Sequence, residues 1–225
     1  MSSVKTNMRL DSAQKRGICI TVAVIVGFMA VVLAMFIHGL NRPVILSDSD
    51  LRNNGVFLFD NPRSLTAFSL TDHHDADFTA ENFLGKWSLV FFGFTYCPDV
   101  CPTTMALLTR FYQAQQSKDF GEDLQIIMAS VDPARDTPEK LLNYVQFFNK
   151  DFVGVTGEFL NLHRFATELN SPFSKVPGGG DNYQVQHGAN IAIINPNGHY
   201  VGFFRSPLDL SKMNLTYKSL RLSRQ

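Results

Sequence analysis

Residues 91–102 read FFGFTYCPDVCP, and this stretch decides the fold. It completes an apolar run over residues 87–92, whose lack of polar alternation predicts a strand covered on both faces. Two thiols, Cys97 and Cys101, follow four positions apart, and Pro102 suits the first position of a helix. The thiol pair is therefore expected where a buried strand leads into a helix.

Hydrophobic periodicity extends the pattern in both directions from this stretch. We predict helices over residues 102–118, from 138 onward, over 159–169 and over 207–222, with a single helical turn at 79–84. We predict further strands at 67–70, 124–131, 152–156, 190–194 and 200–204, the last two joined as a hairpin by Asn197-Gly198. Residues 171–186 form a long loop rich in Gly and Pro. This order predicts an α/β domain with a central mixed sheet and helices on both faces.

Residues 17–40 contain no charged side chain, and about 20 apolar residues suffice to cross a bilayer. The sixteen residues before them carry a net charge of +3, which favours a cytoplasmic N-terminus. A cleaved signal peptide is the alternative, but its apolar region is usually only ~7–15 residues long. We expect a cytoplasmic head (1–16), a transmembrane anchor (17–40), a tether (41–64) in which Val56–Phe59 can dock as an early strand, and a domain (65–225) in the periplasm, with the anchor in a bacterial inner membrane.

The formal net charge is 0, so the residues outside the head carry −3. Nucleic-acid binding normally requires clustered Lys and Arg, and this balance argues against it. The third cysteine, Cys19, lies inside the apolar span and is interpreted as a small apolar filler.

The thiol pair can cycle between dithiol and disulfide or hold a soft metal ion, and buried structural cysteines are the alternative. A helix N-terminus is expected to lower the thiol pKa, and positions i and i+4 share one helical face. Two sulfurs leave a metal ion incompletely coordinated, and imidazole is the natural third ligand. His187 suits this role because it ends the Gly/Pro-rich loop just before a buried strand. His73 and His74 lie in an acidic turn that is expected to be solvated.

Three blocks of the sequence resemble the signature of the Sco/SenC family of copper-binding proteins. The first is residues 92–102, the second is residues 130–138 (SVDPARDTP), and the third is His187 followed by residues 191–198 (IAIINPNG). They occur in the family's order and spacing over residues 65–215.

The resemblance implies a thioredoxin-like fold with an inserted hairpin, and copper, as Cu(I) or Cu(II), bound by Cys97, Cys101 and His187. It implies assembly of the binuclear copper centre of cytochrome c oxidase, with the copper-bearing oxidase subunit or another copper acceptor and periplasmic thiol reductants as partners. The alternative function is a thiol-disulfide oxidoreductase, with Cys97 and Cys101 as a redox-active pair that reduces an acceptor protein without delivering copper. A peroxidase-like enzyme is a weaker alternative, and zinc is the alternative metal.

Many family members carry an acidic residue before the ligand histidine, where this chain has Gln186. A metal-bound imidazole usually has a hydrogen-bond partner that fixes its ring. A backbone carbonyl or Asp132 is expected to supply it. Asp136 and Thr137 are interpreted as caps of the helix that begins at Pro138.

Overall fold

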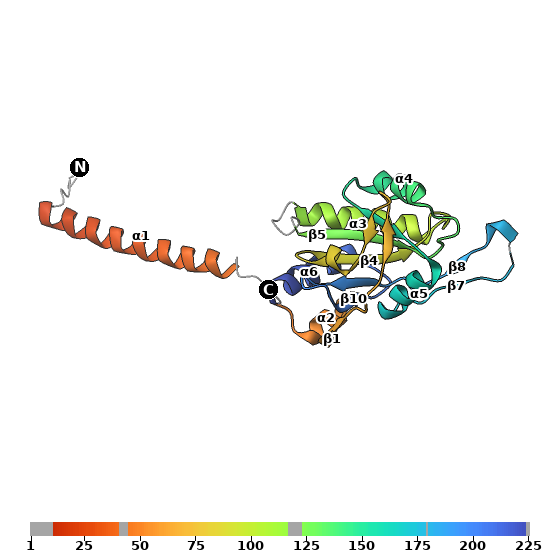
Figure 1. Ribbon diagram of the computed structural model, residues 1–225. Coiled ribbons are helices and arrows are strands. Elements are labelled where there is room, and N and C mark those ends of the chain that lie inside the picture. The colour runs from red at the N-terminus through yellow and green to blue at the C-terminus, as the bar shows by residue number, and fades with distance from the viewer. Residues whose placement is uncertain (1–10, 41–44, 117–122, 179, 224–225) are drawn as a thin grey trace. The chain divides into compact units, whose positions relative to one another are not determined.

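The computed structural model describes residues 11–40, 45–116, 123–178 and 180–223 (Figure 1). The chain divides into two compact units, residues 1–44 and 45–225.

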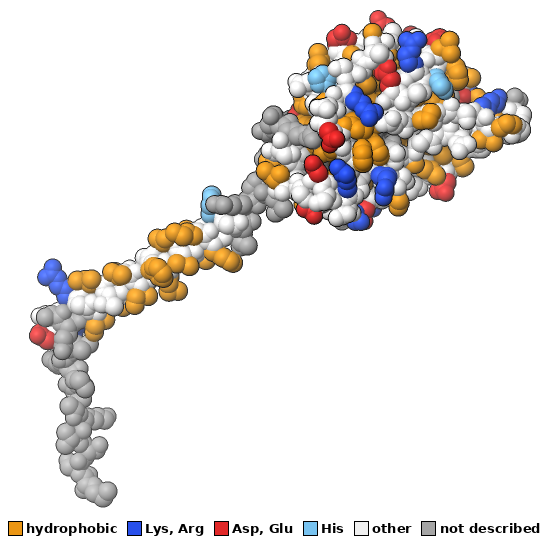
Figure 2. All heavy atoms as spheres, turned by 90° about the horizontal axis from the view of Figure 1, so that it is seen from below, with side chains coloured by type: hydrophobic (Ala, Val, Ile, Leu, Met, Phe, Trp, Pro, Cys, Tyr) orange, Lys and Arg blue, Asp and Glu red, His pale blue; other side chains and the backbone are white. Residues whose placement is uncertain are grey.

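The first unit is the helix α1 (Ser12–Leu40). Its stretch Lys15–Gly39 is long and apolar enough to cross a membrane, and none of it is buried within the protein. Figure 2 shows hydrophobic side chains along the length of this helix. A helix of this length and composition is compatible with a single membrane anchor.

The second unit is built on an eight-stranded mixed sheet in the order β1-β10-β9-β4-β5-β6-β2-β3. The strands are β1 (Val56–Ser64), β2 (Leu70–Asp72), β3 (Asp77–Phe78), β4 (Trp87–Gly93), β5 (Leu124–Ser130), β6 (Val153–Thr156), β9 (Ile191–Ile194) and β10 (His199–Phe204). The central strands β4, β5 and β6 are parallel, and β9 runs antiparallel to β4. The predicted mixed α/β architecture is confirmed.

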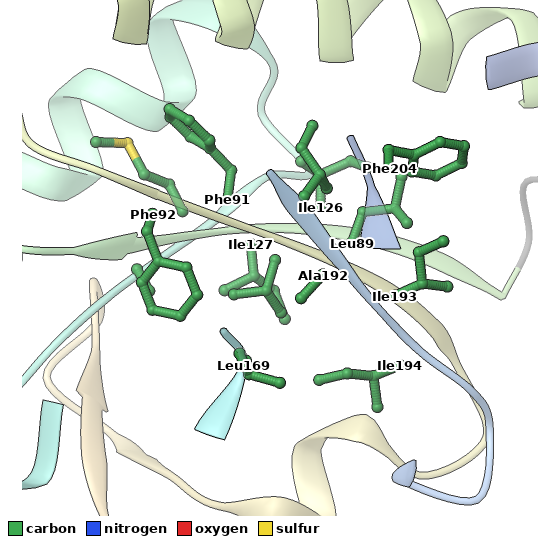
Figure 3. Close-up of a cluster of buried hydrophobic side chains, with 14 of the residues drawn as sticks. Leu89, Phe91, Phe92, Ile126, Ile127, Leu169, Ala192, Ile193, Ile194 and Phe204 are labelled. Atoms are coloured by element: carbon green, nitrogen blue, oxygen red, sulfur yellow. The ribbon is translucent and has the colours of Figure 1, made fainter. Parts of the chain in front are cut away.

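Helices cover both faces of this sheet. They are α2 (Asp48–Asn53), α3 (Val100–Gln116), α4 (Pro138–Phe148), α5 (Phe159–Glu168) and α6 (Leu210–Ser223), with a 3-10 turn at Ala80–Phe83. Phe91 and Phe92 point to opposite sides of β4 (Figure 3). Phe92 contacts Phe165 of α5, whereas the Phe91 side of the strand faces Cys101 of α3. Every residue of β4 and β5 is buried, as the unbroken apolar run predicts for a strand covered on both faces.

The compact unit begins at Ile45, twenty residues before the expected start of the domain. Strand β1 pairs with β10 along the edge of the sheet, and Leu51 and Val56 are buried. The pairing places much of the expected tether inside the fold, because the exposed polar residues of an edge strand give it the composition of a loop.

Most of the remaining elements overlap their predicted ranges. The strand predicted at 67–70 is observed as β2, which shares only Leu70 with it, and β3 was not predicted. Two further differences bear on the site. Helix α3 begins at Val100, so Cys101 lies in its first turn and not before it; Lys118, its predicted end, lies outside the described residues. The long loop contains a hairpin, β7 (Ser174–Lys175) and β8 (Val185–Gln186), with a 3-10 turn at Gly180–Asn182. This hairpin projects beyond the main sheet (Figure 1), and we call it the arm.

Candidate metal and thiol site

Three chain segments meet at the edge of the sheet where β4 and β5 end. Gly93, the last residue of β4, pairs with Ser130, the last residue of β5. Phe91 pairs with Ile191, so the antiparallel β9 begins where β4 ends. The thiol loop after β4, the loop after β5 and the residues before β9 therefore lie together, although they are far apart in sequence.

The two cysteines sit on either side of the start of α3. Cys97 is half-buried in the turn before the helix, and Cys101 is fully buried in the first helical turn. Both are free thiols. The backbone N–H of Cys101 donates a long hydrogen bond to Sγ of Cys97, at 3.5 Å. The first turn of the helix thus directs a backbone donor at the more accessible sulfur.

Burial raises the pKa of the Cys101 thiol far above its ordinary value. The prediction that the helix start lowers the thiol pKa is therefore wrong for Cys101. The helix does supply N–H groups, but loss of solvation outweighs them at a fully buried sulfur. A thiol in such a place stays protonated until an electrophile or a metal ion replaces the proton.

The imidazole of His187 lies next to the thiols. Its Nε2 is 3.8 Å from Sγ of Cys101. The ring makes edge-to-face contacts with Phe91 and Phe94, at centroid distances of 6.3 and 6.0 Å. Its Nδ1 lies 3.0 Å from the carbonyl oxygen of Gly188. Because a carbonyl oxygen can only accept a hydrogen bond, Nδ1 carries the proton and donates it. The lone pair of the neutral ring is then on Nε2, facing the sulfur.

Burial lowers the pKa of His187, so the neutral imidazole is favoured. The prediction that a backbone carbonyl fixes this ring is confirmed by Gly188. The alternative partner, Asp132, has other contacts. Gly188 itself is confined, since an added Cβ would lie 3.1 Å from Oγ of Ser171.

The observed separation suits two ligands of one ion. A borderline-soft ion with bonds of ~2.3 Å to sulfur and ~2.0 Å to nitrogen at ~120° separates them by about 3.7 Å. Cys101 and His187 are at 3.8 Å. Among the residues that the structure describes, no group of three or more His, Cys, Asp and Glu side chains already forms a metal site. Cys97 is half-buried, and its sulfur accepts the hydrogen bond from the N–H of Cys101, so it lies next to this pair.

Asp132 is buried beyond the end of β5 and contacts Arg135 and Tyr183. Its Oδ2 is 2.5 Å from Nε of Arg135, and its Oδ1 accepts a 2.5 Å hydrogen bond from the Tyr183 hydroxyl. Sequence reasoning did not single out Tyr183. It is one aromatic residue in a polar loop, and only the pairing of β7 with β8 brings it to the site.

Thr137 caps α4 as predicted, accepting a hydrogen bond from the N–H of Lys140. The same prediction for Asp136 is wrong. Its buried carboxylate accepts hydrogen bonds from the N–H and hydroxyl of Thr95, at 3.1 and 2.6 Å, and from the hydroxyl of Ser130 at 2.7 Å. A carboxylate with three such donors holds the thiol loop against the end of β5.

The acidic turn with two histidines is only partly solvated. His73 is buried and accepts a 2.8 Å hydrogen bond from the N–H of Gly154, so the expected solvation is wrong for this residue. His74 is exposed, as predicted. The turn packs against β6 because β2 pairs with that strand, and this long-range pairing has no local sequence signal.

Comparisons with known proteins agree with this geometry. The profile of the SCO1/SenC family matches residues 60–220. A putative copper-binding protein of Stutzerimonas stutzeri is 37% identical over 155 residues, covering 69% of this chain and 76% of that protein. The human mitochondrial SCO1 homolog is 36% identical over 138 residues, covering 61% of this chain and 46% of that protein, so the chain spans about half of this longer relative.

Solved structures give the same result. Yeast Sco1 with copper bound superposes with a TM-score of 0.66 at 30% identity, covering 73% of this chain and 91% of that one. Bradyrhizobium japonicum ScoI with copper bound gives 0.60 at 30% identity, covering 70% and 98%. The thioredoxin-like fold is therefore confirmed.

Proposed function

The chain belongs to the SCO1/SenC family, and from that premise we propose that it is a metallochaperone that binds copper through Cys97, Cys101 and His187. Copper is cargo here, taken up and passed on to an acceptor protein. By family, the acceptor is the copper-bearing subunit of cytochrome c oxidase, whose binuclear centre the protein helps to assemble.

The observation that carries this proposal is the approach of Nε2 of His187 to Sγ of Cys101, at 3.8 Å. Thiol-disulfide exchange requires only the two sulfurs, so a desolvated imidazole with its lone pair aimed at one of them has no role in that reaction. Soft thiolates and an imidazole are ligands that copper prefers. Structural zinc normally takes four protein ligands, whereas the set proposed here from the described residues has three.

The surroundings support uptake and release. Cys101 is buried in the first turn of α3, whereas Cys97 and His187 are half-buried in the loops beside it. An incoming ion or an acceptor thiolate can reach Cys97 first, and the protons of the thiols leave as metal binds. The apolar rim of Phe91 and Phe94 excludes water from the imidazole side of the site.

We further propose that α1 anchors the protein once in a bacterial inner membrane, with residues 1–16 in the cytoplasm and the copper site in the periplasm. The positive head supports this orientation. An acceptor in the same membrane is then met by diffusion in two dimensions.

Anaerobic titration of the full-length protein in detergent tests the metal. We expect one Cu(I) per chain, with Cu(I) outcompeting Zn(II) when a chelator buffers both ions. Preference for Zn(II), or no Cu(I) bound at chelator-competitive affinity, would contradict the proposal.

Deletion of the gene separates delivery from reduction. We expect cytochrome c oxidase maturation to fail and to recover when copper is added to the medium. Recovery only with an external thiol would favour the alternative function, reduction of an acceptor protein.

A further inference from the structure

The two halves of the metal site belong to segments that lie 86 positions apart, the thiol loop and the end of the arm. The residues of these two segments do not form one continuous element, so something else must set the distance between them. The loop that follows β5, residues 130–136, contacts both.

The first contact is with the thiol loop. Asp136, which is fully buried, accepts two hydrogen bonds from Thr95, two positions before Cys97. The hydroxyl of Ser130 donates to the same carboxylate at 2.7 Å and accepts from the N–H of Asp132 at 3.0 Å. Asp136 and Asp132 are thus joined through one hydroxyl group.

The second contact is with the arm. The hydroxyl of Tyr183, four positions before His187, donates to Oδ1 of Asp132 at 2.5 Å. Asp132 is 3% exposed, so this charge-assisted hydrogen bond is shielded from water. Val185, two residues before His187, is also buried. The arm is therefore held by contacts close to His187, and not only where it joins the rest of the domain.

Arg135 contacts both sides. Its guanidinium donates from one terminal nitrogen to the carbonyl oxygen of Tyr183 at 2.9 Å and lies 3.7 Å from the centroid of that ring. The same guanidinium lies 4.7 Å from the ring centroid of Tyr96, next to Cys97. Lys140 donates to the Tyr96 hydroxyl and to the carbonyl oxygen of Arg135, at 3.2 and 3.0 Å. A planar group with several donors suits this double contact, which lysine cannot reproduce.

We propose that residues 130–136 act as a bracket that fixes the separation of the thiol loop and the His187 arm, with Arg135 and Tyr183 as its positioning residues. Neither residue binds the metal. They keep Nε2 of His187 at ligand distance from Cys101 before metal arrives, so binding does not have to order the arm. The copper part of this inference rests on the proposed function, whereas the ordering of the arm does not.

The test uses the full-length protein in detergent and four variants. Arg135→Ala removes the whole double contact, Arg135→Lys keeps a cation without the planar group, and Tyr183→Phe removes only the bond to Asp132. Tyr112→Phe is the matched control. Tyr112 lies on the same helix as Cys101, about three turns further along, and its hydroxyl is hydrogen bonded to Asp151, away from the site.

Three readouts are compared. Hydrogen exchange of the metal-free protein reports the order of residues 180–187, chelator competition reports Cu(I) affinity, and the rate of Cys97–Cys101 disulfide formation reports the thiol loop alone. We expect Arg135→Ala to speed exchange in the arm and to lower Cu(I) affinity by about 10- to 100-fold, the range for partners that orient a ligand. Arg135→Lys and Tyr183→Phe are expected to do so less strongly. Disulfide formation in Tyr183→Phe, and all three readouts in Tyr112→Phe, are expected to stay as in the unsubstituted protein.

Unchanged arm exchange in Arg135→Ala and Tyr183→Phe would overturn the bracket. Faster exchange in the arm together with unchanged Cu(I) affinity would also overturn it, because the order of the arm would then not determine how His187 binds the ion. If Arg135→Ala fails to fold, Tyr183→Phe decides, since it removes one oxygen atom and leaves the ring in place. If the unsubstituted protein binds no Cu(I), the proposed function fails, and the exchange data alone still accept or reject the ordering of the arm.

Discussion

The Nε2 atom of His187 faces the sulfur of Cys101 at 3.8 Å, across a gap that only the folded sheet can close. Cys101 lies in the first turn of α3, whereas His187 directly follows β8, four residues before β9 begins. Helix α3 follows β4 and strand β9 pairs with it, so the core brings both side chains to the same end of the sheet. The contacts of residues 130–136 with the thiol loop and the arm then hold them there.

Replacement of His187 tests whether the imidazole is a ligand. We expect His187→Ala to weaken Cu(I) binding by more than about 100-fold, because even partners outside the ligand set contribute about 10- to 100-fold. Disulfide formation between Cys97 and Cys101 should persist, since it does not use the ring. Chelator competition and thiol counting measure the two properties, and unchanged Cu(I) affinity would contradict the proposed ligand set.

Each cysteine of the pair is expected to be essential. Cys97→Ser or Cys101→Ser should abolish both tight Cu(I) binding and the intramolecular disulfide, because each process needs both sulfurs. The matched control is Cys19→Ser, which changes an exposed thiol in α1 and should alter neither. A single-cysteine variant that still supports oxidase maturation in cells would contradict both the chaperone and the reductase schemes.

Gly93 is expected to accept no side chain. An added Cβ would lie 2.7 Å from a ring carbon of Phe91 and 3.1 Å from the sulfur of Cys101. Gly93→Ala should therefore cost about 1–3 kcal/mol in the free energy of unfolding, as overpacking does in well-packed cores. It should also lower Cu(I) affinity by moving the sulfur. Denaturant unfolding and chelator competition measure these effects; a fully stable variant with normal affinity would show that this contact relaxes freely.

His73 should make the folded domain less stable in acid. Burial lowers the pKa of His73 below the ordinary value of 6.5. As the pH falls through 6.5, the imidazole is therefore protonated in the unfolded chain before it is protonated in the folded state. Stability is complete above that pH and declines below it, because protonation of Nδ1 would also remove the bond from the N–H of Gly154.

His73→Asn keeps an acceptor for Gly154 without the titration. We expect its free energy of unfolding to change less between pH 7 and 5 than that of the unsubstituted protein, measured by urea unfolding at each pH. After burial, the exposed neighbour His74 adds to the lowering of the His73 pKa, so His74→Asn should weaken the pH dependence in the same direction but by less than His73→Asn. Parallel pH profiles for His73→Asn and the unsubstituted protein would remove His73 as the cause.

Much of the fold could be predicted from the sequence, because the central elements carry strong local signals. The apolar run before the thiols, the helical spacing after them and the Asn197-Gly198 turn each correspond to an observed element. The expectation that Val56–Phe59 can dock as an early strand is confirmed by β1, but its place at the edge of the sheet depends on pairing with the distant β10 and has no local signal.

The ligands of the site could be proposed from residue type and family pattern, but their environment could not. The burial that raises the pKa of Cys101 and lowers that of His187 depends on packing from several elements. The contacts of Asp132, Asp136 and Tyr183 are likewise long-range, and capping was the reasonable local expectation for Asp136. Local patterns report which residues can react, whereas the fold decides what surrounds them.

The pairing of Gly93 with Ser130 as the final rung between β4 and β5 has a wider consequence. Cys97, Cys101 and His187 all lie in loops or a first helical turn beyond that pair, whereas the buried strands behind it carry none of the proposed ligands. Substitutions in these loops can therefore alter the proposed site without disturbing the pairing of β4 with β5.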